Sequence, residues 1–199
     1  MKSTLTSMIL SLGCITVVSG AILAGVHELT EQPIIEAERQ ARVDAVGEVC
    51  PRFDNDPIAE KCEVTPDGET LPVTLYPATL GGKPVGAAVE SYSPDGFSGE
   101  IKIMYGFDSD GNVTGYSVIS HAETPGLGAK MADWFRSPEG HRSVIGLNAA
   151  TDNLTVGKDG GDVDAITAAT ITSRAFLDAL RRASAAYSQF KSTNSNLPS

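Results

Sequence analysis

The chain has 199 residues, of which 41% are hydrophobic and 20% charged, and this composition is typical of a globular protein and not of a disordered one. Its formal net charge is −10 at pH 7, without a basic stripe along the sequence. Because nucleic-acid phosphates need clustered Lys and Arg, the composition argues against a nucleic-acid partner. The length fits one domain of ordinary size with an appendage.

The first predicted element is a membrane anchor at residues 8–26. These 19 residues, from Met8 to Val26, carry no charge. At about 1.5 Å per residue, a helix of this length nearly spans a bilayer core of about 30 Å. Lys2 precedes the segment and glutamates follow it, a charge bias that favours residues 1–7 in the cytoplasm and the body outside. A cleaved signal peptide is the alternative, although no small-x-small cleavage site follows the segment before His27.

Two cysteines, Cys50 and Cys62, lie twelve positions apart in the body of the chain. In an oxidising compartment they could close a small loop, worth up to about 3 kcal/mol in the chain-entropy model. Two free thiols are the other interpretation. A metal site is disfavoured because no histidine lies near them.

The next elements are a helix and a set of strands. Residues 34–46 have apolar side chains mostly at helical spacing, with Pro33 suited to the first turn and Pro51 beyond the end. Four segments rich in Val, Ile, Thr and Tyr then predict strands at 70–80, 83–93, 99–108 and 112–123. Turn residues between these segments predict an antiparallel meander.

The C-terminal part is predicted to contain a short helix at 129–138 and a short strand running into a turn at 153–162. An amphipathic helix follows at 172–190, and residues 191–199 form a flexible tail. The predicted fold class is therefore α+β: one anchor helix, then a single domain at 27–190 with an antiparallel sheet flanked by helices.

The first candidate site is the glycine-containing stretch HAETPGLGAKM at 121–131. Gly126 and Gly128 allow positive φ angles and close approach of the backbone to a ligand. The stretch matches neither the phosphate-binding loop of nucleotide hydrolases nor the dinucleotide-binding glycine pattern. A plain strand-to-helix turn is the alternative.

The second candidate site is VDAITAATITSRAF at 163–176, where four hydroxyls gather before a helix: Thr167, Thr170, Thr172 and Ser173. One interpretation is helix capping, in which a hydroxyl accepts a hydrogen bond from a backbone N–H. The other is that a hydroxyl holds a phosphate or is esterified to one, because a helix N-terminus attracts anions.

The segment DAITAAT at 164–170 resembles the flavinylation motif Asp-x-x-Ser/Thr-Gly-Ala-Thr/Ser, to which a flavin transferase attaches FMN through a phosphoester bond. Together with 121–131, in this order, it is similar to the G subunits of the Rnf ion-translocating electron transport complex. The resemblance covers about residues 34–190 and is strongest at 93–182.

The resemblance implies that Thr170 carries the FMN. The signature read by the transferase then comprises Asp164, Thr167, Ala168, Ala169 and Thr170. Ala168 departs from the family pattern, which has glycine there, and alanine tolerates positive φ poorly.

The resemblance also implies further contacts with the flavin. Four residues of the first stretch lie along it, namely Glu123, Thr124, Leu127 and Gly128. Thr167 contributes to the same site, and Thr172 or Ser173 helps to hold the phosphate.

The implied function is that of an electron relay in a bacterial inner-membrane complex that passes electrons between ferredoxin and NAD, coupled to Na⁺ or H⁺ movement. The subunit spans the membrane once, with its main domain on the periplasmic side. Its partners are the other subunits, the flavin transferase and, through 8–26, membrane lipid. It acts as part of an oxidoreductase, with no metal and no independent catalysis expected, because no Cys or His cluster or catalytic triad is present.

Two alternatives to this function stay open from the sequence. One is the C subunit of a Na⁺-translocating NADH:quinone reductase, which carries the same motif. The other belongs to a different class, an exported binding or scaffold module in which the threonines only cap a helix.

Overall fold

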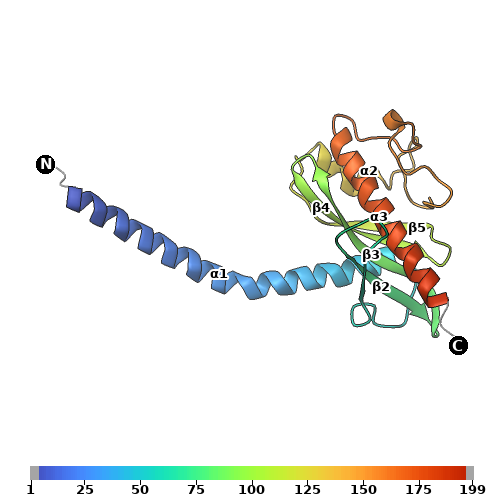
Figure 1. The fold of residues 1–199 in the computed structure, drawn as a ribbon, viewed down its shortest axis with the longest axis horizontal. Helices are drawn as coiled ribbons and strands as arrows, with labels where there is room; N and C mark the ends of the chain where they lie inside the picture. Colours follow the sequence, from blue (N-terminus) through green and yellow to red (C-terminus); the bar gives the residue numbers. More distant parts are fainter. Residues whose placement is uncertain (1–4, 196–199) are drawn as a thin grey trace. The chain divides into compact units, whose positions relative to one another are not determined.

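The computed structural model describes residues 5–195, and the chain divides into two compact units, Met1–Ala41 and Arg42–Ser199. The first unit consists of most of the helix α1 (Leu5–Val49), and the second contains the sheet and the remaining helices (Figure 1). Among the described residues, α1 is the one helix long and apolar enough to cross a membrane, judged by length and composition.

The helix α1 is continuous, whereas the sequence predicts an anchor followed by a separate helix near Pro33. Pro33 lies inside α1, where a proline lacks the backbone N–H and typically costs about 3 kcal/mol. The residues around it, rich in Glu, Ala, Arg and Gln, favour helix and continue it on both sides. The predicted end before Pro51 is confirmed.

The second unit is built on a five-stranded antiparallel meander in the order β1-β2-β3-β4-β5. The strands are β1 (Cys62–Val64), β2 (Val73–Leu80), β3 (Lys83–Gly96), β4 (Gly99–Asp108) and β5 (Val113–Ser120). The four predicted strands and their antiparallel order are confirmed. The three-residue β1 was not predicted, because it is too short to show alternation.

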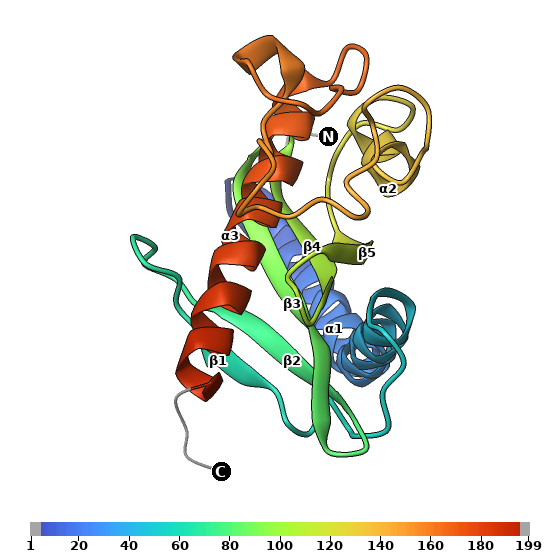
Figure 2. The same ribbon diagram turned by 90° about the vertical axis from the view of Figure 1, so that its right-hand side faces the viewer.

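One face of the sheet is covered by α3 (Thr170–Ser195), which lies across it in Figure 2. Alternate residues of the central strands point to this face, among them Val89, Ile103 and Tyr105. They pack against the apolar side of α3, including Phe176 and Leu180. The helix continues to Ser195, five residues into the segment 191–199 that the sequence assigns to a tail; residues 196–199 lie outside the described residues.

The other face of the sheet is covered, within the second unit, by the end of α1. Ala45, Val46 and Val49 are buried there against strand residues that include Met104. Gly106 permits this contact, because a Cβ at that position would lie 2.0 Å from the carbonyl oxygen of Val49. The sheet is therefore sandwiched between two helical segments far apart in the sequence.

The two body cysteines lie on opposite faces of this sheet, and both are free thiols. Cys62, on β1, packs against the cluster under α3, whereas Cys50 packs against the cluster under α1. Burial raises the pKa of the Cys50 thiol to about 12 and also raises that of Cys62. The two thiols are free in this structure and pack against different apolar clusters, which favours the free-thiol alternative over the disulfide.

The connection between β5 and α3 is mostly irregular. The predicted short helix at 129–138 is present as the 3₁₀ turn η1 (Gly128–Lys130) followed by α2 (Met131–Trp134). Of the short strand running into a turn that the sequence predicts at 153–162, the turn is confirmed and the strand is wrong. Only an isolated bridge joins Val156 to Val163, and the 3₁₀ turn η2 (Gly157–Asp159) follows the first of them, because glycines at 157, 160 and 161 favour a turn.

Candidate functional site

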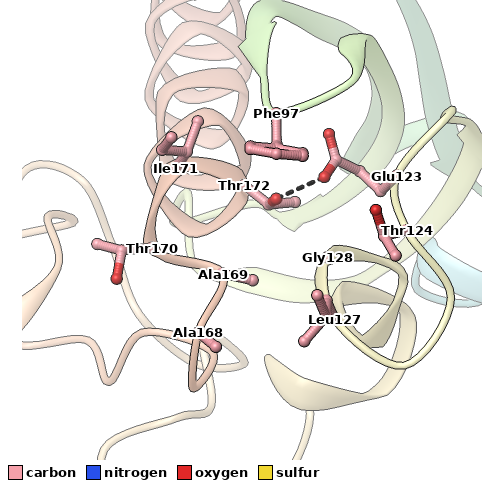
Figure 3. Close-up of a pocket in the computed structure, with 10 residues that line it drawn as sticks. All are labelled: Phe97, Glu123, Thr124, Leu127, Gly128, Ala168, Ala169, Thr170, Ile171 and Thr172. Carbon is pink, nitrogen blue, oxygen red and sulfur yellow. Dashed lines mark hydrogen bonds between the residues drawn. The ribbon is translucent and has the colours of Figure 1, made fainter.

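The two stretches singled out from the sequence meet at one pocket, about 320 Å³ in volume (Figure 3). Three segments form it: the tip of the β3–β4 hairpin, the loop after β5, and the turn that starts α3. Its lining consists of Phe97, Glu123, Thr124, Leu127, Gly128, Ala168, Ala169, Thr170, Ile171 and Thr172. A pocket of this size is within the usual range for a small ligand, about 300–1,000 Å³.

Glu123 connects these three segments. Its Oε2 accepts a hydrogen bond of 2.6 Å from the hydroxyl of Thr172 on α3, and its Oε1 accepts one of 3.0 Å from the N–H of Ser98 in the hairpin. The Glu123 side chain is buried, and Thr172 is fully buried. A buried carboxylate is costly unless it is hydrogen-bonded, so these contacts both satisfy Glu123 and hold the pocket together.

The two glycines of the loop serve different purposes. Gly126 has a φ angle of +79° with no atom near the place of a Cβ, so it is needed for its backbone conformation. At Gly128 a Cβ would lie 2.3 Å from Oε2 of Glu123 and 2.6 Å from Oγ1 of Thr172. The expected positive φ therefore occurs at Gly126. Gly128 lies close to the Glu123 and Thr172 side chains, and its approach to a ligand stays a prediction.

The hydroxyls at the start of α3 have distinct partners. Ser173 closes the turn before the helix: its Oγ accepts from the N–H of Ile166 and donates to the carbonyl of Ala169, both at 2.9 Å. Thr172 bonds to Glu123, and Thr167 is exposed. Simple capping does not account for this group, because Thr172 and Ser173 make these contacts away from the first N–H groups of the helix.

The N-terminus of α3 presents backbone N–H groups beside the pocket. The N–H of Ser173 makes the first hydrogen bond of the helical pattern, to the carbonyl of Ala169. The N–H groups of Thr170, Ile171 and Thr172 precede it, at positions where a helix supplies no carbonyl partner. Such groups, with the helix dipole, favour an anion.

Ala168 occupies the turn immediately before the helix with a φ angle of 62°, and it is the one non-glycine residue with a positive φ in the described part of the chain. For an L-residue with a Cβ this conformation costs roughly 1–2 kcal/mol. Glycine at this place in the resembled motif would avoid that cost. The substitution is tolerated at the expense of local strain.

Thr170 is the first residue of α3 and lies at the rim of the pocket, half-buried. Figure 3 shows its hydroxyl directed away from the Glu123–Thr172 pair. Its Oγ1 accepts a hydrogen bond of 3.3 Å from the Nζ of Lys158, on η2.

Asp164 is tied into the fold, in addition to its place in the resembled motif. Its Oδ2 accepts from the N–H of His141 at 2.9 Å, and its carbonyl accepts from the indole N–H of Trp134 at 2.9 Å. The side chain thereby anchors the segment before α3 to the loop after α2.

Two lining residues, Phe97 and Ile171, were not predicted from the sequence. Phe97 is 67% exposed at the hairpin tip, and Ile171 is 48% exposed on α3. A large apolar residue in a glycine-bounded turn is the signal that would have revealed Phe97, since such turns are usually polar.

The residues present fit a flat aromatic ligand that carries a phosphate. Phe97, Leu127 and Ile171 offer apolar walls to a ring, and Gly128 leaves room for the Glu123–Thr172 contact at the same pocket. The helix N-terminus and Lys158 suit the phosphate. Such a site, on an antiparallel sheet with a closing helix, suits a domain that binds a flavin nucleotide.

Comparison with known families agrees with this class. Residues 96–185 match the profile of the FMN-binding domain, a range that includes the hairpin tip, both stretches and most of α3.

Proteins that are similar over most of their length identify the family. The chain is 36% identical to the G subunit of the ion-translocating oxidoreductase complex of Aliivibrio fischeri strain ES114, over 92% of this chain and 90% of that protein. It is 39% identical to the protein of the same name from Yersinia pestis, over 89% and 88% of the two chains. For Vibrio cholerae strain O395 the identity is 34%, over 83% and 82%. The chain belongs to the family of G subunits of the ion-translocating oxidoreductase complex.

Proposed function

We propose that this subunit carries FMN as a phosphoester on Thr170, with the flavin ring in the pocket beside it. The observation that carries the proposal is the position of Thr170. It is the last residue of the resembled flavinylation motif, and it lies where the rim of the pocket meets the N-terminus of α3. The FMN-binding domain supports the identity of the group.

The chain's own residues have separate parts in this arrangement. Thr170 Oγ1 would give up its proton and form the bond to the flavin-bearing phosphorus of a phosphoanhydride donor; the anhydride P–O bond would break, and the half of the donor without the flavin would leave with its phosphate. Phe97, Leu127 and Ile171 cover the ring, and the N–H groups at the start of α3 face the phosphate. When bound, FMN supplies one- and two-electron transfer.

Within the complex, the subunit acts as a relay that passes electrons between ferredoxin-linked and NAD-linked partners, coupled to translocation of Na⁺ or H⁺. It is anchored by 8–26 in the bacterial inner membrane with the main domain on the periplasmic side, and it is matured by a flavin transferase. Covalent attachment suits this compartment, because a dissociated flavin there would be lost. Of the three hypotheses from the sequence, family membership supports the G subunit over the C subunit of a Na⁺-translocating NADH:quinone reductase and over a non-redox scaffold.

The first prediction tests the attachment site. The protein made with an active flavin transferase should stay fluorescent after denaturation, and the FMN mass should map to the peptide containing Thr170. Thr170→Val removes the oxygen while keeping the β-branched shape, so it should abolish covalent flavin. Thr170→Ser is the matched control and should keep it, because the hydroxyl remains.

Thr172→Val provides the second control. It removes the hydrogen bond to Glu123 but leaves Thr170 intact, so it should retain covalent flavin. FMN mass on Thr167 or Thr172 would show that FMN is attached to that residue and not to Thr170. No FMN on any peptide despite an active transferase would overturn the proposed function.

A further inference from the structure

A charged cluster lies outside the pocket lining, on the side of α3 to which the Thr170 hydroxyl points. It consists of Lys158 and Asp159 on η2 and Arg174 on α3. Asp159 binds Arg174 through two hydrogen bonds of 2.7 and 2.8 Å. These bonds lower the pKa of Asp159 and raise that of Arg174, so both groups are charged at neutral pH.

Two contacts join η2 to the first turn of α3: Lys158 contacts Thr170, and Asp159 contacts Arg174. Thr170 and Arg174 are four residues apart and share one side of the helix. The consecutive residues Lys158 and Asp159 meet these two positions in turn. Because Asp159 holds Arg174 in a bidentate ion pair, the backbone of η2 is tied beside the first turn of α3.

The turn that carries Lys158 is itself supported by its neighbours. Gly157 donates its N–H to the carbonyl of Val163 at 2.9 Å, next to the isolated bridge between Val156 and Val163. Gly160 ends η2 in the left-handed conformation, with φ of 85°. Lys158 is therefore presented from a turn that is braced on both sides.

The charges of the cluster leave one positive charge beside Thr170. Asp159 pairs with Arg174 and is also attracted by the charge of Lys158, but Lys158 itself makes no salt bridge within residues 5–195, so the three groups carry one net positive charge. Its ammonium group donates instead to Thr170 Oγ1, the atom to which the phosphate is attached in the proposed function. A phosphodiester carries a single negative charge, which matches this cation.

We propose that Lys158 is the positioning residue for the phosphoryl group on Thr170, pairing with its negative charge and directing the hydroxyl before attachment. This inference rests on the proposed attachment at Thr170. Lys158 lies outside the flavinylation motif, on η2, and the Asp159–Arg174 pair holds η2 in place.

The test compares Lys158→Met, which keeps the length of the side chain, with Lys158→Arg, which keeps the charge. Lys83→Met is the charge-matched control, because Lys83 starts β3 at the end opposite the hairpin tip. Full-length proteins are loaded by the flavin transferase, and FMN on the Thr170 peptide is followed by mass. Loading of Lys158→Met should be slower by about tenfold, as for loss of a charge-assisted hydrogen bond, with the other two variants near wild type.

A second measurement observes the phosphate itself, after loading has been driven to completion. The ³¹P resonance of the native wild-type protein should differ from its denatured position. In Lys158→Met it should move toward the denatured position, and in Lys158→Arg it should stay near wild type. This readout does not depend on electron transfer or on recognition by the transferase.

The outcomes separate the two proposals. A wild-type resonance in Lys158→Met overturns the role of Lys158, even if loading is slow, since the lysine would then serve only the transferase. Failure of Lys158→Arg to accept FMN also overturns the proposed role of Lys158, because a positive charge at position 158 would then not be enough to support attachment. Absence of FMN from wild-type Thr170 is instead a failure of the proposed function.

Discussion

A side chain at position 128 would occupy the space in which Glu123 and Thr172 meet. Both of those residues are buried, so neither can move into solvent to make room. The hydrogen bond between them joins the loop after β5 to α3, across 49 positions of sequence. At the scale of single residues, the pocket thus depends on the absence of one Cβ.

Gly128→Ala should therefore disturb the pocket. We expect a loss of about 1–3 kcal/mol in the free energy of unfolding, as for overpacking of a buried site, and a changed flavin absorption spectrum. Gly126→Ala is the control: it is strained by its φ angle of +79° but meets no atom, so it should lose stability with the spectrum unchanged. Identical spectra for Gly128→Ala and wild type would show that the Glu123–Thr172 contact does not shape the flavin site.

Ala168 offers a gain in stability at the same scale. Replacing it with glycine removes the strain of a positive φ, which outweighs the added entropy of the unfolded chain, so Ala168→Gly should stabilise the flavin-free protein by about 0.5–1 kcal/mol. Thermal unfolding of the full chain in detergent measures this. Ala169→Gly is the control, because Ala169 is buried without a positive φ, and it should be destabilising. A lower melting temperature for Ala168→Gly would contradict the strain argument.

At the scale of elements, the sheet divides the second unit into two apolar layers. One layer lies under α3 and contains Phe176 and Tyr105; the other lies under the end of α1 and contains Val49 and Met104. Tyr105 also donates its hydroxyl to the carbonyl of Phe176 at 2.8 Å, which fixes α3 on the sheet. This attachment holds the first turn of α3, and with it Thr170, at the pocket.

The same division predicts free thiols. Cys50 and Cys62 lie in different layers, so both should react with a thiol reagent after denaturation without reductant. In the native protein Cys50 should react slowly, since burial raises its pKa to about 12 and leaves little thiolate at neutral pH. Mass spectrometry counts the labels. Complete protection of both cysteines in the denatured, unreduced protein would instead establish the bridge.

At the scale of the whole molecule, the chain combines a long apolar helix with one flavin-binding domain. Residues 8–26 of α1 are uncharged, and their apolar side chains are exposed. Exposure of this kind suits a candidate membrane span, for which a lipid bilayer would cover the apolar side chains.

Topology is the prediction that belongs to this scale. A reporter fused after Ser199 should be active in its extracytoplasmic form, because the charge bias around residues 8–26 predicts that the domain lies outside the cytoplasm. The same reporter fused at the N-terminus should be active only in the cytoplasm. Cytoplasmic activity of the C-terminal fusion would reverse the orientation.

Local patterns in the sequence determined the elements of this protein. Alternation of apolar residues located β2 to β5, and helical spacing located α3, because these signals depend only on neighbours along the chain. The two stretches 121–131 and 163–176 were identified as candidate sites from their glycines and hydroxyls. Motif resemblance pointed to FMN, and the matching domain confirms that group.

Only the tertiary structure decided which of these residues meet. It paired Thr172 with Glu123, brought Phe97 to the pocket, placed Lys158 beside Thr170 and put the two cysteines against different apolar clusters. None of these relations has a local signature, since each depends on how the sheet and α3 pack. Packing joins positions that are distant along the chain, whereas periodicity and motifs report only on positions that are near.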